Sequence, residues 1–384
     1  MYVRSTAIER ESRLTELEIH YGSGTPYIPD PSISRLKIRR DHCQCNECVH
    51  PDTKQRLLDT FSIDPKISIK STMEGTGVTH IEFSDGHQSV IPHDMVGRLH
   101  PSGQSAERLG LVKEKRWTKS IKDDPPVIDY EEIMQSDEGV GKWTKLIREY
   151  GFSYVSNCPV DPSATQTLIE RIAFIRHTHY GGFWDFTSDL SSRDTAYTSL
   201  ALAAHTDTTY FSDPAGLQLF HLLSHTDGSG GSSLLVDGFR CAAKLHHQDP
   251  AAYATLSNTP VYSHASGNEG ISVQPYRAFP VLLHDEEGEL VQVRWNNSDR
   301  LGIDAGVEGV REWYEAARKW NEIVTAEESE YWEQLRPGRP LIFDNWRVLH
   351  GRSAFTGKRR LCGAYVNRDD FISRYKMTNG RGNV

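Results

Sequence analysis

The chain has 384 residues, of which 37% are hydrophobic, 25% charged and 10% aromatic. This composition is typical of a globular protein and excludes a disordered or fibrous one, and the length predicts one large domain with a smaller one. The formal net charge of −9 argues against general electrostatic binding to nucleic acid.

The sequence contains no run of 18 or more apolar residues, so we expect no membrane span. The first 21 residues lack the apolar core of a secretory signal, and their four glutamates differ from the acid-poor composition of a transit peptide. We therefore expect a cytoplasmic protein, with a mitochondrial location as the alternative.

The N-terminal part predicts a small β-rich domain. Segments with strand character are separated by turn residues and cover residues 14–22, 33–40, 67–71, 78–86 and 88–92. A polar, mostly charged stretch at 103–126 then predicts a linker. We place the domain boundary within it, which gives domains 1–118 and 119–384.

From Val127 onward the pattern changes. Residues 129–157 predict a helix that leads into a strand, and 165–175 predict a second helix because Leu168, Ile172 and Ile175 recur at helical spacing. One further helix, over about 307–325, interrupts strand-like runs at 216–223, 232–239, 260–265, 291–297, 340–346 and 360–366. Many strands with few helices predict a mainly β fold, a barrel or a double-sheet jelly roll.

His205 and Asp207 stand two residues apart in "AHTDTTYF", a spacing that puts both side chains on one face of a strand. Non-haem Fe(II) oxygenases bind their metal with two histidines and one carboxylate and leave positions open for a co-substrate and O₂. A polar strand end is the alternative interpretation. The best third ligand is His350, which ends the run "IFDNWRVLH" before a glycine.

A further strand follows as "KRRLCGAYV", and it carries Arg359 nine residues after His350. A guanidinium there would bind the far carboxylate of a dicarboxylate whose 2-oxo acid end chelates the metal. The histidine pair, the carboxylate and this arginine form a far more specific pattern together than any of them does alone.

Three of the six cysteines, Cys43, Cys45 and Cys48, fall within six residues. Without a secretory signal, a metal site is favoured over a disulfide framework. Three thiolates and one histidine would make a closed tetrahedral zinc site. His42 and His50 flank the cluster as candidate fourth ligands.

These motifs resemble the γ-butyrobetaine and trimethyllysine dioxygenases, the 2-oxoglutarate-dependent enzymes of carnitine biosynthesis. The resemblance covers residues 127–375 and rests on "DTAYTSLALAAHTDTTYFSDPAGLQLFHLL", "GGSSLLVDGF", "VRWNNSDR", "LRPGRPLIFDNWRVLHGR" and "RLCGAYVNRDD". It implies a distorted double-stranded β-helix with Fe(II) at His205, Asp207 and His350.

The same resemblance implies that Arg359 anchors 2-oxoglutarate. The sequence leaves Arg352 as a second candidate and does not decide whether Arg359 or Arg360 points inward. The resemblance also implies His87, in "SDGHQS", as the fourth zinc ligand, ascorbate as reductant, and a homodimer.

Aromatic residues gather in "HYGGFWDF" and "DTAY", just before the metal pair. Aromatic faces attract quaternary ammonium groups, and each contact is worth roughly 0.5–2 kcal/mol. The resemblance implies a cage formed by Tyr180, Trp184, Tyr197 and Tyr365. Polar candidates for the rest of the substrate are Asp185 and Asp194 for an ammonium group and Asn296 and Asn297 for a carboxylate.

The function implied is hydroxylation of N6-trimethyllysine at C3 with 2-oxoglutarate and O₂, the first step of carnitine biosynthesis. The nearest alternative is a γ-butyrobetaine dioxygenase with the same residues. An alternative of another class is a non-catalytic binder of methyl-lysine, which has no need of His350 or Arg359. A third is an oxygenase of sulfonates or other small acids, which the aromatic residues disfavour.

Overall fold

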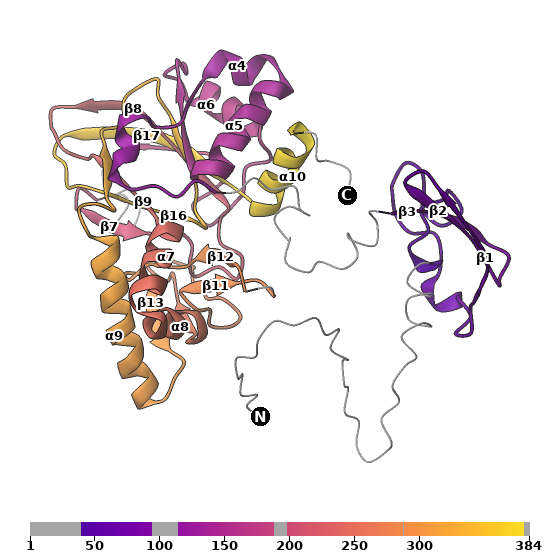
Figure 1. Ribbon diagram of the computed structural model, residues 1–384. Helices are drawn as coiled ribbons and strands as arrows, with labels where there is room; N and C mark the ends of the chain where they lie inside the picture. Colours follow the sequence, from indigo (N-terminus) through magenta and orange to yellow (C-terminus); the bar gives the residue numbers. More distant parts are fainter. Residues whose placement is uncertain (1–39, 94–113, 188–197, 287, 380–384) are drawn as a thin grey trace. The chain divides into compact units, whose positions relative to one another are not determined.

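The computed structural model describes residues 40–93, 114–187, 198–286 and 288–379, which fall into two compact units (Figure 1). The strand expected at 14–22 lies outside the described residues, as does all but the last residue of the one expected at 33–40. Trp117, expected in the N-terminal domain, packs in the second unit, where its ring lies 5.2 Å from that of Phe152.

The first unit is a three-stranded antiparallel sheet with a short 3-10 helix. Its elements are η1 (Thr60–Ser62), β1 (Ile69–Gly75), β2 (Val78–Phe83) and β3 (Gln88–Pro92). These strands confirm the expectations at 67–71, 78–86 and 88–92. The core is small, because Ile63, Ile67, Ile81, Phe83 and Ile91 are its buried apolar residues.

The second unit contains two larger sheets, which confirm the jelly-roll expectation. One has six strands in the order β4 (Val127–Asp129), β5 (Phe152–Ser156), β15 (Leu341–Asp344), β8 (Leu217–Thr226), β17 (Lys358–Val366) and β6 (Trp184–Thr187). The other has the order β14 (Tyr331–Glu333), β9 (Ser233–Asp237), β16 (Val348–Arg352) and β7 (Leu202–His205). Two further pairs are β10 (Val261–Ser263) with β13 (Arg300–Ile303) and β11 (Leu282–His284) with β12 (Leu290–Val293).

Helices gather in two groups in the second unit (Figure 1). One group contains α4 (Tyr130–Gln135), α5 (Asp137–Tyr150), α6 (Pro162–Glu170) and α10 (Arg368–Thr378). The other contains α7 (Gly238–Gln248), α8 (Pro250–Asn258) and α9 (Val307–Val324), and the short η2 (Lys119–Asp123) precedes β4.

The expectation of a single helix after residue 200 was wrong, since α7, α8 and α10 were not foreseen. The strand expected at 232–239 ends at Asp237, whose carboxylate accepts hydrogen bonds from the backbone N–H groups of Phe239 and Arg240. This cap satisfies donors that a new helix otherwise leaves unpaired, so α7 begins at Gly238.

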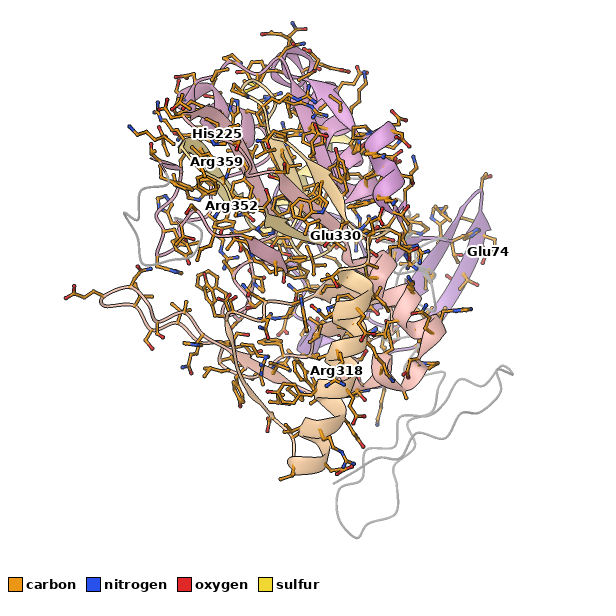
Figure 2. The ribbon with its side chains drawn as sticks, turned by 90° about the vertical axis from the view of Figure 1, so that its left-hand side faces the viewer. Glu74, His225, Arg318, Glu330, Arg352 and Arg359 are labelled. Atoms are coloured by element: carbon orange, nitrogen blue, oxygen red, sulfur yellow. The ribbon has the colours of Figure 1, made fainter. Side chains whose placement is uncertain are left out.

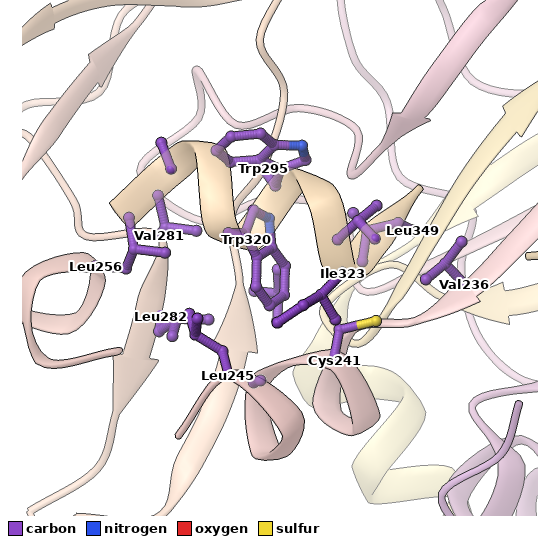
Figure 3. Packing of buried hydrophobic residues seen from close by; sticks show 14 of the residues in the cluster. Val236, Cys241, Leu245, Leu256, Val281, Leu282, Trp295, Trp320, Ile323 and Leu349 are labelled. Atoms are coloured by element: carbon purple, nitrogen blue, oxygen red, sulfur yellow. The ribbon is translucent and has the colours of Figure 1, made fainter. Parts of the chain in front are cut away.

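A hydrophobic cluster joins α9 to the strands beneath it (Figure 3). Trp313, Trp320 and Ile323 recur at helical spacing on the buried face of α9. Trp320 meets Trp295 at a ring distance of 6.3 Å, and Leu349 of β16 belongs to the same cluster. The packing therefore fixes both the strand that carries His350 and the segment that begins at Trp295.

Candidate active site

His205, Asp207 and His350 come together although they are distant in sequence. β7 and β16 are antiparallel neighbours, and His205 and His350 are direct cross-strand partners whose rings lie 4.3 Å apart. Asp207 follows β7 by two residues, and its Oδ1 lies 3.1 Å from Nε2 of His205 and 3.8 Å from Nε2 of His350. One ligand atom from each residue lies within 4.8 Å of the others.

The chemistry of these donors fits a divalent metal. Two ligand atoms bound at right angles about 2.1 Å from an ion lie about 3 Å apart, close to the separation of His205 from Asp207. Nδ1 of His205 lies 2.8 Å from the carbonyl oxygen of Ala203, a contact that directs its proton there and leaves Nε2 for the metal.

The protonation states of His350 and Asp207 suit ligation as well, whereas burial lowers the pKa of His205 but the hydrogen bond and charge of Asp207 outweigh it and raise that pKa. Burial, followed by the charge of His205, lowers the pKa of His350 to about 3, so its imidazole is neutral. Burial raises the pKa of Asp207, but the two histidines outweigh it and hold that pKa well below its usual range. A neutral imidazole and an ionised carboxylate are the forms that bind metals.

Asn345 supports the triad and was missed from the sequence. Its side chain accepts a hydrogen bond from the backbone N–H of Asp207 at 2.7 Å and donates to the carbonyls of Asp207 at 2.9 Å and Ala215 at 3.0 Å. Asn345 is buried, so these bonds hold the loop after β7 in one conformation. Its place in "IFDNW" was visible in the sequence, but its partners were not.

A cavity of about 720 Å³ opens beside the triad and receives residues from both large sheets. The four-stranded sheet contributes His205, His350 and Arg352, and the six-stranded sheet contributes Arg359, Tyr365 and Trp184. Aromatic lining residues are Tyr180, Trp184, Phe186, Tyr210, Phe220, Trp295, Trp313, Tyr314 and Tyr365.

Arg359 is 1% exposed, and its Nε has no hydrogen-bond partner among the described residues. Its guanidinium lies over the ring of Phe355 at 5.0 Å, and the guanidinium of Arg352 lies over the same ring at 4.8 Å. Figure 2 labels both arginines, which lie near one another. Burial, then the charge of Arg352, lowers the pKa of Arg359 to about 10, which leaves it protonated at neutral pH. A buried guanidinium of this kind is stabilised by an anion in the cavity.

Strand alternation separates Arg359 from its neighbour. Arg360 is exposed and makes a two-pronged contact with Asp185, at 2.9 Å and 2.5 Å. Arg359 is therefore the inward residue of the pair. Asp185 is engaged on the outer side by this contact and is not among the residues that line the cavity.

Arg352 lies in the same cavity but is held by the backbone. Its Nη2 donates to the carbonyl oxygens of Thr198 at 2.7 Å and Leu200 at 2.9 Å. Its guanidinium therefore shapes the cavity wall as well as contributing charge.

The predicted aromatic residues within the described part of the chain meet in the cavity. The hydroxyls of Tyr180 and Tyr210 lie 3.1 Å apart, and the rings of Trp184 and Tyr365 lie 6.1 Å apart. Tyr365 also donates a hydrogen bond from its hydroxyl to Oδ2 of Asp207 at 2.7 Å. Two predicted residues, Tyr197 and Asp194, lie outside the described residues.

Asn296 and Asn297 both line the cavity. The side chain of Asn296 donates to Oδ2 of Asp299 at 2.8 Å and accepts from the backbone N–H of Ser298 at 2.9 Å. Asn296 thus shapes a turn, and Asp299, which the sequence did not single out, is a further cavity residue.

The first unit carries a second candidate metal centre. Nε2 of His87 lies 3.3 Å, 3.6 Å and 3.5 Å from the sulfurs of Cys43, Cys45 and Cys48. A tetrahedral zinc with ordinary bond lengths would separate nitrogen from sulfur by about 3.6 Å, so these four residues fit the ion. Nδ1 of the rival His50 instead accepts from the backbone of Asp52 and Thr53.

Comparisons with known proteins agree with this geometry. The family described as taurine catabolism dioxygenase TauD, TfdA family matches residues 115–365, and the family described as gamma-butyrobetaine hydroxylase-like, N-terminal matches residues 9–92. A trimethyllysine dioxygenase from Neurospora crassa is 47% identical over 381 residues, covering 88% of this chain and 79% of that protein.

Two human proteins are also similar. The mitochondrial trimethyllysine dioxygenase of Homo sapiens is 38% identical and covers 88% of this chain and 81% of that protein. The gamma-butyrobetaine dioxygenase of Homo sapiens is 29% identical and covers 92% of this chain and 93% of that protein. Within the described residues, no helix is both long and apolar enough to cross a membrane.

Proposed function

We propose an activity for this chain from its family: it belongs to the trimethyllysine dioxygenases, within the TauD, TfdA family. The activity is hydroxylation of N6-trimethyllysine at C3, with 2-oxoglutarate and O₂ as co-substrates. One observation carries this proposal, namely a cavity that combines the His205–Asp207–His350 triad with the buried cation Arg359 and an aromatic wall.

His205, Asp207 and His350 would hold Fe(II) by one face. When bound, iron supplies the activation of O₂, coupled to decarboxylation of 2-oxoglutarate to succinate and to oxidation of the substrate. The contribution of the protein is to fix its ligands, which Asn345 and Tyr365 do by bonding to Asp207.

The other cavity residues bind and orient the reactants. Arg359 binds the far carboxylate of 2-oxoglutarate, with Arg352 beside it as the second cation. Tyr180, Trp184 and Tyr365, together with Tyr197, hold the trimethylammonium group against their faces. A trimethylammonium donates no hydrogen bond, so its position depends on these contacts. Fixing both reactants in this way converts a three-body encounter into a reaction within one complex.

A product assay tests the proposal. Purified protein is incubated with Fe(II), 2-oxoglutarate, ascorbate and O₂, with trimethyllysine or γ-butyrobetaine supplied in parallel. We expect a trimethyllysine product 16 Da heavier, succinate in equal amount, and loss of both in His205→Ala. Faster turnover of γ-butyrobetaine would replace the substrate assignment. Ligand binding without succinate from either compound would support the non-catalytic binder.

We propose further that Cys43, Cys45, Cys48 and His87 bind a structural zinc ion and that ascorbate keeps iron reduced. A homodimer is part of the same proposal, to be tested by mass determination in solution. The name of the human relative places that protein in mitochondria, which supports the mitochondrial alternative over the cytoplasmic expectation. Fractionation with organelle markers tests the compartment.

A further inference from the structure

Trimethyllysine carries two cations, a trimethylammonium and an α-ammonium, whereas γ-butyrobetaine carries one. The aromatic wall suits the first cation, but an α-ammonium has three N–H donors and requires acceptors. C3, the carbon to be hydroxylated, is bonded directly to the α-carbon. The partner of the α-ammonium must therefore lie close to the metal triad. This reasoning rests on the proposed function.

The described part of the cavity lining contains two carboxylates, Asp207 and Asp299. Asp207 belongs to the triad and receives the hydroxyl of Tyr365 as well. Asp299 is thus the carboxylate among these residues that can serve the substrate. The adjacent Arg300 also lines the cavity, so consecutive residues offer both charges that a zwitterionic amino acid requires.

Asp299 lies beside the loop of residues 206–211, which reaches both ends of the proposed substrate site. Asp207, in this loop, is the carboxylate of the triad. Two residues later, the hydroxyl of Thr209 lies 3.5 Å from Oδ2 of Asp299. The next residue, Tyr210, has its hydroxyl 3.1 Å from that of the cage residue Tyr180. The carboxylate therefore lies beside the loop that joins the triad to the aromatic wall.

The segment that carries Asp299 is held in place before any substrate arrives. The backbone of Trp295 exchanges hydrogen bonds with Thr206, at 2.7 Å through its carbonyl and 3.0 Å through its N–H. Asn296 donates to the carboxylate of Asp299, and the backbone N–H of His264 donates to its carbonyl at 2.9 Å. Trp295 is also anchored in the cluster of Figure 3. Such preorganisation lowers the entropy lost on binding.

We propose that Asp299 binds the α-ammonium group of trimethyllysine and thereby distinguishes this substrate from γ-butyrobetaine. Asn296, which the sequence suggested as a carboxylate ligand, orients Asp299 in this arrangement. The residue acts through charge-assisted hydrogen bonds to the substrate, so its effect depends on whether the substrate carries an ammonium group at that position.

The test compares trimethyllysine with 6-(trimethylammonio)hexanoate, which has the same length and lacks only the α-ammonium. The wild type is expected to prefer trimethyllysine by about 10- to 100-fold in kcat/KM, the range of a charge-assisted hydrogen bond. In Asp299→Asn this preference should fall to near one, through loss of activity on trimethyllysine alone. Because the ratio is measured within one variant, a change in the folded fraction cancels.

A binding measurement gives a second readout. Calorimetric titration of the metal-free protein with trimethyllysine should show a similar fold loss of affinity in Asp299→Asn, and the deaminated compound should bind both proteins equally. Asp213→Asn is the matched control, because Asp213 is largely exposed and pairs with Arg176 on the surface. Its ratio should remain that of the wild type.

The result that overturns the proposal is an unchanged substrate ratio in Asp299→Asn, including an equal loss on both compounds. Collapse of the ratio in Asp194→Asn but not in Asp299→Asn would overturn it as well and assign the role to Asp194. If the wild-type protein turns over neither compound, the proposed function is wrong and this inference fails with it. That outcome is distinguishable from the two above, in which the wild-type protein is active and only the role of Asp299 is wrong.

Discussion

The two candidate metal sites of this chain differ in what surrounds the donors. In the first unit, one nitrogen lies 3.3–3.6 Å from three sulfurs, close to the nitrogen–sulfur separation of a tetrahedral zinc site. In the second, three donors lie on one side and a cavity of about 720 Å³ lies on the other. A complete donor set leaves no position for a reactant, whereas the incomplete set does. This difference in open positions is the reason to propose a structural role for the first site and a catalytic role for the second.

The scaffolds differ in the same sense. The two histidines of the triad stand on neighbouring strands of a sheet that is packed into a large hydrophobic cluster, and Asp207 lies in the turn directly after one of these strands. The cysteines lie on turns, such as the one closed by the N–H of Cys48 and the carbonyl of Cys45, above a core of a few buried side chains. A small core supplies little folding free energy, so a metal has more to contribute there.

The largest effect is expected from the closed site. In Cys45→Ser the zinc is lost, and the first unit should lose most of the roughly 10 kcal/mol or more that structural zinc provides. Hydrogen exchange of β2 should then approach that of an unfolded chain, while the triad still binds its metal. Metal analysis and exchange mass spectrometry measure both. His50→Ala is the matched control, and full protection of β2 without zinc would contradict the structural role.

The open site should respond in activity and not in folding. His350→Ala removes one of three ligands, so we expect turnover to fall by at least about a thousandfold through loss of the metal. Zinc content and protection of β2 should remain. His247→Ala, at the exposed end of α7, is the control. Retention of both iron and turnover in His350→Ala would place the metal elsewhere.

Substitution of Arg359, the proposed 2-oxoglutarate anchor, is expected to have a smaller effect. Arg359→Gln removes a two-pronged charge-assisted contact, which should raise the KM for 2-oxoglutarate about a hundredfold and leave iron binding intact. Arg360→Gln, its outward neighbour paired with Asp185, should change little. A larger effect in Arg352→Gln than in Arg359→Gln would transfer the main anchor to Arg352.

Much of this arrangement was predictable because it is carried by local pattern. The pairing of His205 with Asp207 and the apolar run before His350 led to residues that the fold does bring together. The reason given for the pair was wrong, because β7 ends at His205 and Asp207 lies in the turn that follows it rather than on the same strand face. The alternation of Arg359 and Arg360 was recognised, but choosing between them required knowing which face of β17 is buried.

What the sequence did not predict depends on distant partners. Asn345 forms hydrogen bonds with the backbone of Asp207, 138 positions away in the sequence, and no local sequence pattern indicates that contact. Asp299 reaches the cavity because Trp295 is bound to Thr206, 89 positions away. The helix α7 was missed for a different reason: its strand-like sequence continues past Asp237, and only the cap at that residue ends the strand.

The smallest predicted effect concerns a histidine that belongs to neither cluster. His221 is fully buried on β8, where its Nε2 accepts from the N–H of Gly338 at 3.0 Å and its Nδ1 lies 2.7 Å from the hydroxyl of Thr165. Since Nε2 accepts, Nδ1 carries the proton and donates it to Thr165. The ring is thus a neutral bridge between structural elements, in contrast to the histidines that serve metals.

Burial lowers the pKa of His221 to about 4, below the unfolded value of about 6.5. The unfolded chain then binds more protons between these values, so stability is lost as pH falls. Between pH 7 and pH 5 the second unit should lose about 2 kcal/mol of unfolding free energy through this group. The variant His221→Gln should be less stable at pH 7, and this part of the dependence of unfolding free energy on pH should vanish in it. Denaturant unfolding at several pH values measures the dependence. An identical slope in both proteins would mean that His221 takes up its proton as readily in the folded chain as in the unfolded one, which its hydrogen bond from Gly338 opposes.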